Sequence, residues 1–251
     1  MSCITVRNCP IGEGRPKVIL PIVESTESGI LAKAKEFSTL RAECVEWRVD
    51  WFDSCMDPGA VARCAQKLRV ILRDKLLLVT FRTKAEGGEQ PLSHKEYLDL
   101  LGLVLDTDCA DLLDVEFFTA GEDLPDLIQR AHSAGVAVVC SSHDFCKTPP
   151  CAQLVDRMVR MQQAGADLPK VAVMPQSPAD VLELLAATAE MTEHHPDTPV
   201  ITMSMGALGA VSRLAGETFG SAMTFANPGH ASAPGQVPLD VVNGVLDALH
   251  L

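Results

Sequence analysis

Eight short runs rich in β-branched and other apolar residues recur along the whole chain, and segments with helical spacing separate them. In segment 60–74, apolar side chains repeat every three or four residues, which is typical of an amphipathic helix. Ser93 with Glu96, and Ser177 with Asp180, have the spacing of a capping box and predict where two more helices begin. Strict alternation of strand and helix indicates a parallel sheet covered by helices. The predicted strands are residues 18–23, 44–49, 76–81, 112–117, 136–140, 170–174, 200–204 and 222–225.

Eight such repeats in 251 residues predict an α/β protein of the (β/α)8 TIM-barrel class, with residues 1–251 forming one domain. Residues 1–14 precede the first strand and are predicted to form an N-terminal hairpin that closes the barrel bottom. The alternative is an open, doubly wound sheet. That architecture usually carries a glycine-rich phosphate-binding turn after its first strand, and none follows Val23.

Charge and cysteine usage narrow the class of protein. Lysine and arginine total 21 against 33 aspartates and glutamates, and this net charge of −12 argues against a nucleic-acid partner. No apolar stretch reaches the ~18 residues of a membrane-spanning helix, and the N-terminus lacks a signal-peptide core, so a cytoplasmic protein without a membrane partner is predicted. Nine cysteines without a C-x-x-C pair are predicted to be reduced, mostly buried thiols. Cys140, Cys146 and Cys151 near His143 fit no zinc spacing, so no metal site is predicted.

The positions of charged residues within the predicted strands carry the clearest functional signal. Along residues 45–50, charged and apolar side chains alternate, so Glu46 and Arg48 share one strand face. Arg82, and then Asp114 and Glu116, repeat this pattern on the next two strands. Apolar faces of barrel strands pack against the helices, so the charged faces are expected to point to the barrel axis. Because desolvating an unpaired charge costs several kcal/mol, these groups either form a structural ion-pair network or line a wet pocket. We favour the pocket for the set as a whole, and a purely structural role fits Asp114 and Glu116 better than the others.

Lys170 and His143 are a candidate chemical pair. Lys170 heads the apolar run 170–174, where burial would disfavour its ammonium form and leave an amine able to form a Schiff base with a ketone. The alternative is a structural salt bridge to Glu46 or Glu116. His143 ends segment 136–143, an extension of the fifth predicted strand. Its ordinary pKa of about 6.5 suits proton transfer at neutral pH, although a lone histidine there is as often structural.

Two segments after the last predicted strands complete the candidate site. Arg213 follows the seventh strand, where an arginine fork can bind a carboxylate or a phosphate. Residues 231–236 follow the eighth strand and are small and polar, as in a movable lid. The alternatives are a surface helix residue for Arg213 and a plain loop for 231–236.

In chain order, these segments resemble type I 3-dehydroquinate dehydratase, the imine-forming dehydratase family of the shikimate pathway, over nearly the whole chain. The segments that carry the resemblance are 46–50 (EWRVD), 80–82 (TFR), 86–89 (EGGE), 141–145 (SSHDF), 148–149 (TP), 170–175 (KVAVMP), 203–206 (MSMG), 212–213 (SR) and 232–236 (SAPGQ).

The resemblance implies dehydration of 3-dehydroquinate to 3-dehydroshikimate, a step towards aromatic amino acids, without a metal or organic cofactor. It implies that Lys170 forms an imine with the substrate ketone, that His143 transfers protons, and that Glu86 orients His143. The family is usually a homodimer. Substrate binding, directly or through a neighbouring site residue, is implied for Glu46, Arg48, Arg82, Met203, Met205, Arg213, Phe225, Ser232, Ala233 and Gln236.

Two positions depart from the family pattern, and two other functions stay open. Pro21 stands where some relatives have a serine, and Ser142 stands where asparagine, histidine or tyrosine is more usual. A class I aldolase on the same barrel would also use Lys170, and residues 205–209 weakly resemble a phosphate-binding turn. The second alternative is a barrel that binds a metabolite without catalysis.

Overall fold

The computed structural model describes residues 2–229 and 235–251. The predicted roles of Ser232 and Ala233 therefore concern positions outside the described residues, whereas Gln236 lies within them.

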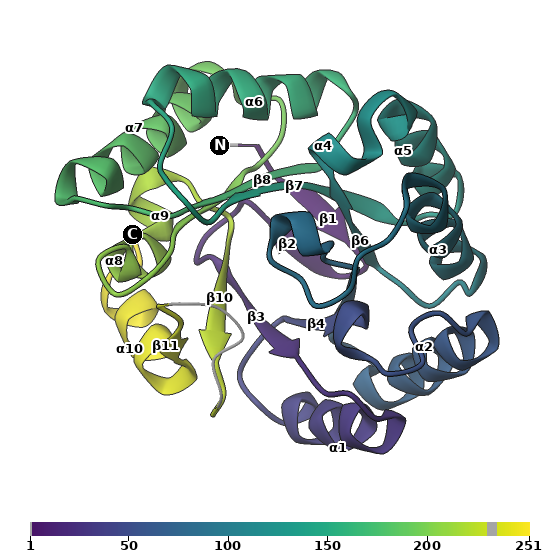
Figure 1. The fold of residues 1–251 in the computed structure, drawn as a ribbon. Helices are drawn as coiled ribbons and strands as arrows, with labels where there is room; N and C mark the ends of the chain where they lie inside the picture. Colours follow the sequence, from purple (N-terminus) through teal and green to yellow (C-terminus); the bar gives the residue numbers. More distant parts are fainter. Residues whose placement is uncertain (1, 230–234) are drawn as a thin grey trace.

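The main sheet is parallel and curls into a barrel, with the strand order β11-β10-β3-β4-β5-β6-β7-β8-β9 (Figure 1). Its last two barrel strands, β9 and β10, meet through a bridge between Val200 and Ser221. The N–H of Ala222 also donates to the carbonyl of Val200 at 2.8 Å. The predicted (β/α)8 barrel is confirmed. The strands are β3 Lys17–Ile22, β4 Cys44–Arg48, β5 Leu76–Thr80, β6 Leu112–Glu116, β7 Ala137–Asp144, β8 Leu168–Val173, β9 Ile201–Ser204, β10 Met223–Asn227 and β11 Val237–Pro238.

Helices surround the ring of strands (Figure 1). Ser93 and Glu96 form the predicted capping box of α3, and the N–H of Ser177 donates to Asp180 at the start of α7. The longer helices are α1 Glu27–Ser38, α2 Pro58–Leu72, α3 His94–Asp106, α5 Leu124–Ser133, α6 Cys151–Gln163, α7 Pro178–His194 and α10 Leu239–Ala248. Short helices occupy the connections: η1 Val49–Trp51, η2 Lys84–Glu86, α4 Phe117–Ala120, η3 Gly121–Asp123, α8 Ala210–Leu214 and α9 Gly216–Phe219.

Alternation along the strands produces two apolar cores. Side chains such as Trp47 and Val115 pack between the sheet and the helices, whereas Leu78 and Leu112 pack inside the barrel. The N-terminal residues form an antiparallel hairpin of β1 Ile4–Val6 and β2 Cys9–Ile11. Ile11 is fully buried in the inner core, so the hairpin closes the barrel bottom as predicted.

Several predicted strand boundaries are wrong. The largest difference is at β7, which runs to Asp144 rather than ending at residue 140. Lys170 does not open its strand, because β8 begins at Leu168 and Lys170 is its third residue. The sequence did not indicate this start because residue 169 is a proline, which is rarely found inside a central strand. At another boundary, Phe117 belongs to α4 rather than to β6.

The nine cysteines are free thiols, and most of them are buried, as predicted: Cys44, Cys55, Cys64, Cys109 and Cys140. In the described part of the chain, no helix is long and apolar enough to cross a bilayer.

Candidate active site

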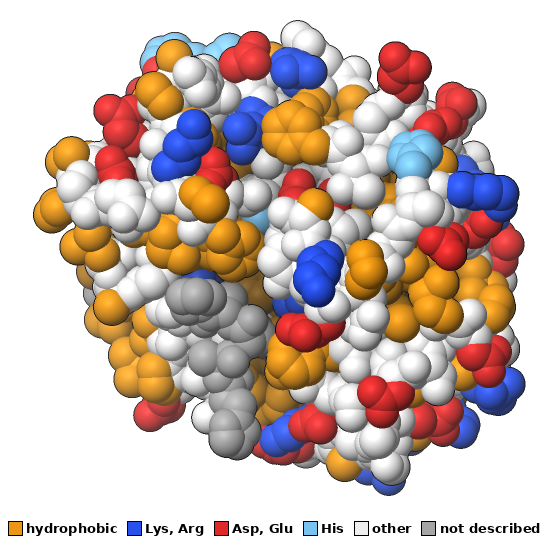
Figure 2. Space-filling model, in the orientation of Figure 1, with side chains coloured by type: hydrophobic (Ala, Val, Ile, Leu, Met, Phe, Trp, Pro, Cys, Tyr) orange, Lys and Arg blue, Asp and Glu red, His pale blue; other side chains and the backbone are white. Residues whose placement is uncertain are grey.

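A cavity of about 180 Å³ opens at the C-terminal ends of the barrel strands. Figure 2 faces this end of the molecule, where the surface is hollowed near its centre. Three residues that were not predicted as site residues, Gly87, Phe145 and Ala172, line the cavity. The predicted site residues that line it are Glu46, Arg48, Arg82, Glu86, His143, Lys170, Met203, Met205, Arg213, Phe225 and Gln236.

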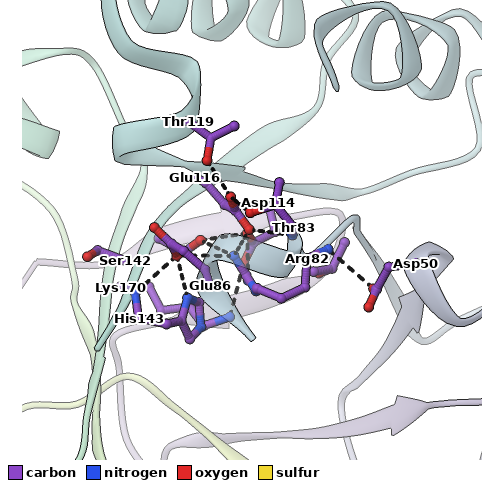
Figure 3. Close-up of polar contacts among 12 residues, drawn as sticks. Asp50, Arg82, Thr83, Glu86, Asp114, Glu116, Thr119, Ser142, His143 and Lys170 are labelled. Atoms are coloured by element: carbon purple, nitrogen blue, oxygen red, sulfur yellow. Dashed lines mark hydrogen bonds and ion pairs between the residues drawn. The ribbon is translucent and has the colours of Figure 1, made fainter. Parts of the chain in front are cut away.

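Strand register brings Lys170 and His143 together. Lys170 on β8 pairs in register with Ser141 on β7, and His143 lies two residues further along β7 on the same inward face. Both side chains line the cavity, and Figure 3 shows them next to each other. The amine and the imidazole can therefore reach one bound molecule from neighbouring strands.

Lys170 is buried, and its Nζ lies 3.0 Å from Asp114 Oδ2. Its ion-pair partner is thus Asp114, and neither Glu46 nor Glu116, the two partners considered from the sequence. The Nζ also lies 4.9 Å from the centre of the Phe225 ring, an apolar wall on the cavity side. This environment holds the amine in place while limiting its access to water.

Arg82 ties Lys170 into a buried network of charged groups (Figure 3). Its guanidinium donates to Asp114 at 2.8 Å and to Glu116 at 2.9 Å, and it also lies 3.6 Å from Glu86. Lys170 and Arg82 are thereby paired with buried carboxyl groups beneath the cavity. Burial alone would raise the pKa of Asp114, but the charges of Arg82 and Lys170 outweigh burial and lower it. The barrel interior therefore holds both the ion-pair network and the pocket that the sequence offered as alternatives.

Asp50 and Glu116 fix the loops around this network, and the sequence did not mark either as a site residue. The Asp50 carboxylate accepts hydrogen bonds from Nε and Nη2 of Arg48, at 2.8 and 2.7 Å. It also accepts the backbone N–H of Arg82 at 3.2 Å. Glu116 accepts from the N–H and hydroxyl of Thr83 at 2.8 and 2.7 Å. Buried carboxylates thus hold the backbone that follows β4 and β5.

Glu86 is placed against His143 by the loop after β5. Its Oε2 lies 2.8 Å from His143 Nδ1 and accepts the backbone N–H of His143 at 3.0 Å. The loop turns at Gly87, which has φ +87°, and a side chain at Gly88 would overlap the carbonyl oxygen of Arg82. The two glycines therefore permit the close approach that carries Glu86 to the imidazole.

Burial disfavours charge on both members of the Glu86–His143 pair. It raises the pKa of Glu86 to about 8. The pKa of His143 lies well below its ordinary value, because of burial first and then the nearby positive charges of Arg82 and Lys170. His143 is thus a neutral imidazole at neutral pH, with Nδ1 held by Glu86 and Nε2 left for a molecule in the cavity.

Arg213 comes from α8 rather than from an open loop, and its side chain is buried at the cavity wall. Burial lowers the pKa of this guanidinium to about 10, still high enough to keep it charged at neutral pH. Its Nη1 lies 3.6 Å from Met203 Sδ. On another wall, Glu46 accepts the hydroxyl of Thr80 at 2.8 Å. The cavity thus combines cations, a carboxylate and an apolar wall.

Neither position that departs from the family pattern is among the described residues that line the cavity. Ser142 faces away from the barrel axis, and its Oγ accepts from Arg157 Nη1 at 3.0 Å. Pro21 is buried on β3 in register with Glu46.

The cysteines near His143 are dispersed. Cys140 is buried in the outer core, Cys146 is exposed and Cys151 is half-buried. Within residues 2–229 and 235–251, no three His, Cys, Asp or Glu side chains are grouped so that they could hold a metal ion.

Comparison with known proteins decides the family. The model of type I 3-dehydroquinase matches residues 18–251. The chain belongs to the type I 3-dehydroquinase family. It is 44% identical to the 3-dehydroquinate dehydratase of Salmonella typhimurium over 100% of this chain and 99% of that protein, and 45% identical to the one of Bacillus subtilis over 100% and 98%.

Solved structures agree with this family membership. The type I 3-dehydroquinate dehydratase of Clostridium difficile, described with covalently modified comenic acid, superposes with a TM-score of 0.96 at 44% identity, covering 99% of this chain and 98% of that one. The enzyme from Geobacillus kaustophilus gives a TM-score of 0.95 at 40% identity, covering 99% and 96%. The predicted enzyme class, a 3-dehydroquinate dehydratase, is confirmed.

Proposed function

We propose that this chain dehydrates 3-dehydroquinate to 3-dehydroshikimate through an imine on Lys170, with His143 as the general acid and base. The observation that carries the proposal is the placement of a buried amine and a neutral imidazole on neighbouring strands of one cavity. A β-hydroxy ketone needs an electron sink beside the carbon that loses a proton, and it needs a proton for the departing hydroxide. The amine and the imidazole provide these two functions.

Imine formation begins when Lys170 Nζ attacks the C3 carbonyl carbon and the carbonyl oxygen leaves as water. The ammonium must first lose a proton, and Asp114 beside it and His143 on the neighbouring strand are the groups that can assist. The protonated imine withdraws electrons from C2 and so acidifies the C2–H bond. Burial among Phe225 and Ala172 keeps water from hydrolysing the imine early.

Elimination then moves one proton in two steps, from C2 to His143 and from His143 to the departing hydroxyl. The neutral His143 takes a proton from C2 through Nε2, and the imidazolium that forms is held through Nδ1 by Glu86. The C2 electron pair moves toward the imine as the enamine, and its return expels the C1 hydroxyl, which receives the proton from His143 and leaves as water. Hydrolysis of the product imine consumes the water released at the start, so the net reaction releases one water.

The remaining wall residues orient the substrate. Arg213 binds the substrate carboxylate, because its guanidinium is charged and buried at the cavity wall. Glu46 and Arg48 contact hydroxyl groups, Arg82 holds the carboxylates beneath the site, and Gln236 adds a polar group to the cavity wall. Met203, Met205 and Phe225 pack against the ring. Fixing the substrate between the lysine and the histidine contributes a large part of the rate. A homodimer in the cytoplasm stays a prediction.

The decisive assay follows the conjugated enone of 3-dehydroshikimate by its absorbance, with 3-dehydroquinate as substrate. The native chain is expected to generate the enone, and Lys170→Ala is expected to lose turnover. Lys84→Ala is the matched control, because Lys84 is exposed near the same site, and it should keep turnover. Substantial turnover in Lys170→Ala would refute the imine mechanism, and no enone from the native chain would refute the function itself.

A further inference from the structure

A second cavity lies at the opposite end of the barrel, against the N-terminal ends of β3 and β5. We call it the basal cavity. Its volume is about 810 Å³, which is within the range of small-molecule sites. Its walls come from the turn of the β1–β2 hairpin, from the segments that follow α1 and α2, and from the first residues of both strands. No described residue lines both this cavity and the active site.

The basal cavity is basic, although the protein is acidic. Five of its lining residues are Arg or Lys, and Glu43 and Asp74 are its acidic members. Glu43 accepts the N–H of Val18 at 2.7 Å and pairs with Arg15 at 3.5 Å, and Arg15 also pairs with Asp247 at 3.0 Å. Arg7 pairs with Asp111 at 3.4 Å. Among the described residues, the remaining three cations, Lys17, Arg73 and Lys75, have no ion-pair partner, and this local excess of positive charge in a chain of net charge −12 needs a reason. The basic residues are Arg7, Arg15, Lys17, Arg73 and Lys75.

The two lysines lack anionic side-chain partners in the part of the chain that the structure describes. Lys17 Nζ donates to two backbone carbonyls at 3.0 and 3.1 Å, and Lys75 Nζ donates to two others at 2.8 and 2.6 Å. Carbonyls orient an ammonium without neutralising it, and each ammonium keeps a third N–H. Burial lowers the pKa of Lys75, and the nearby charge of Glu43 offsets this effect only in part.

Two of the arginines occupy backbone conformations that arginine adopts reluctantly. Arg7 in the hairpin turn has φ +53°, and Arg73 at the end of α2 has φ +43°. Asp108 is the other non-glycine residue with positive φ among the described positions. Asparagine or glycine suits such a hairpin turn, and glycine suits such a helix end. Folding alone would therefore favour other residues at both positions, and strained backbone of this kind concentrates at functional sites.

We propose that the basal cavity is a second ligand site that binds a small polyanion, a metabolite carrying phosphate or carboxylate groups. Arginine forks bind such groups through paired N–H bonds, and the remaining N–H of each lysine adds a point charge. The anion would supply the negative charge for Lys17, Lys75 and Arg73, which form no ion pair within residues 2–229 and 235–251. The proposal is independent of the reaction in the active site.

Isothermal titration calorimetry at constant ionic strength tests it, with inorganic pyrophosphate and citrate as the probes. The test variant combines Arg7→Asn and Arg73→Gly. Both substitutions relieve a positive φ, which offsets the loss of the 3.4 Å contact between Arg7 and Asp111. The double variant is therefore expected to unfold at a urea concentration close to that of the native chain. Arg63→Gln is the matched control, because Arg63 is an exposed arginine of α2 outside the cavity.

We expect the native chain to bind at least one probe saturably, at one site per chain. The double variant should bind it at least about tenfold more weakly, since two charged contacts are lost, whereas Arg63→Gln should bind as the native chain does. Binding of pyrophosphate alone would assign a phosphorylated ligand, and binding of citrate alone a carboxylated one.

Two outcomes overturn the proposal. One is that neither probe binds to the native chain. The other is that binding survives in the double variant but disappears in Arg213→Gln, because the anion would then occupy the active site.

Discussion

Replacing Asp114 by asparagine tests whether the buried charge network holds the barrel interior together. The Asp114 carboxylate is fully buried and contacts Lys170 at 3.0 Å, Arg82 at 2.8 Å and Ser141 Oγ at 2.6 Å. Asp114→Asn keeps the shape but leaves Lys170 without its counter-ion. Removing one partner of a buried pair destabilises by about 3–5 kcal/mol, a large share of the roughly 5–15 kcal/mol that stabilises a typical domain.

Urea unfolding at pH 7 measures this loss, and Asp106→Asn is the matched control. Asp106 pairs with Arg130 at the same 2.8 Å, but its side chain is 67% exposed, so this substitution should change the free energy of unfolding by no more than about 1 kcal/mol. Equal losses in the two variants would refute the reasoning.

The loss in Asp114→Asn is also expected to depend on pH. The folded-state pKa of Asp114 is lowered, so its contribution is present above its unfolded pKa of about 3.9 and is lost as the pH falls through the lower folded value. The difference in the free energy of unfolding between the native chain and Asp114→Asn should therefore become smaller in acid. A gap that is constant between pH 7 and pH 3 would contradict the assigned pairing.

Two further predictions concern His143 and its partner Glu86. His143→Ala should lower kcat by about 10²–10⁴-fold, while Lys170 still forms an adduct with the substrate. His132→Ala is the control, because it alters an exposed imidazole paired with Asp167, and it should leave kcat unchanged. A near-normal kcat in His143→Ala would remove His143 from its role. For Glu86, the folded pKa of about 8 lies above the unfolded value of about 4.3. Its favourable contribution is therefore present below about pH 4 and is lost as the pH rises towards 8. Urea unfolding at pH 5 and pH 8 should show the native chain losing stability relative to Glu86→Gln, and an unchanged difference would contradict the raised pKa.

The barrel was predictable from the sequence because short β-rich runs alternate along the chain with segments of helical spacing. The capping boxes at Ser93 and Ser177 placed two helix starts within a residue. The short helices α4, α8 and α9 were not predicted, since four or five residues are too few to show a helical period. Pro169 concealed the start of β8 because its missing N–H argues against a central strand.

Much of the site could be predicted because alternation along a strand tells which side chains face the barrel axis. Alternation does not tell how far along the barrel axis each residue lies relative to residues on the other strands. The offset between β6 and β8 brings Asp114, rather than Glu46 or Glu116, to Lys170. The role of Asp50 in holding backbone N–H groups after β5 also depends on loop conformation, which leaves no periodic trace in the sequence.

Trapping the imine tests the central claim most directly. The native chain, incubated with 3-dehydroquinate and then reduced with borohydride, should gain the mass of one reduced ligand, and peptide mapping should locate that mass on Lys170. Lys84→Ala should form the same adduct, and Lys170→Ala should form none. An adduct on a different lysine, or full turnover with no adduct on the native chain, would contradict the account.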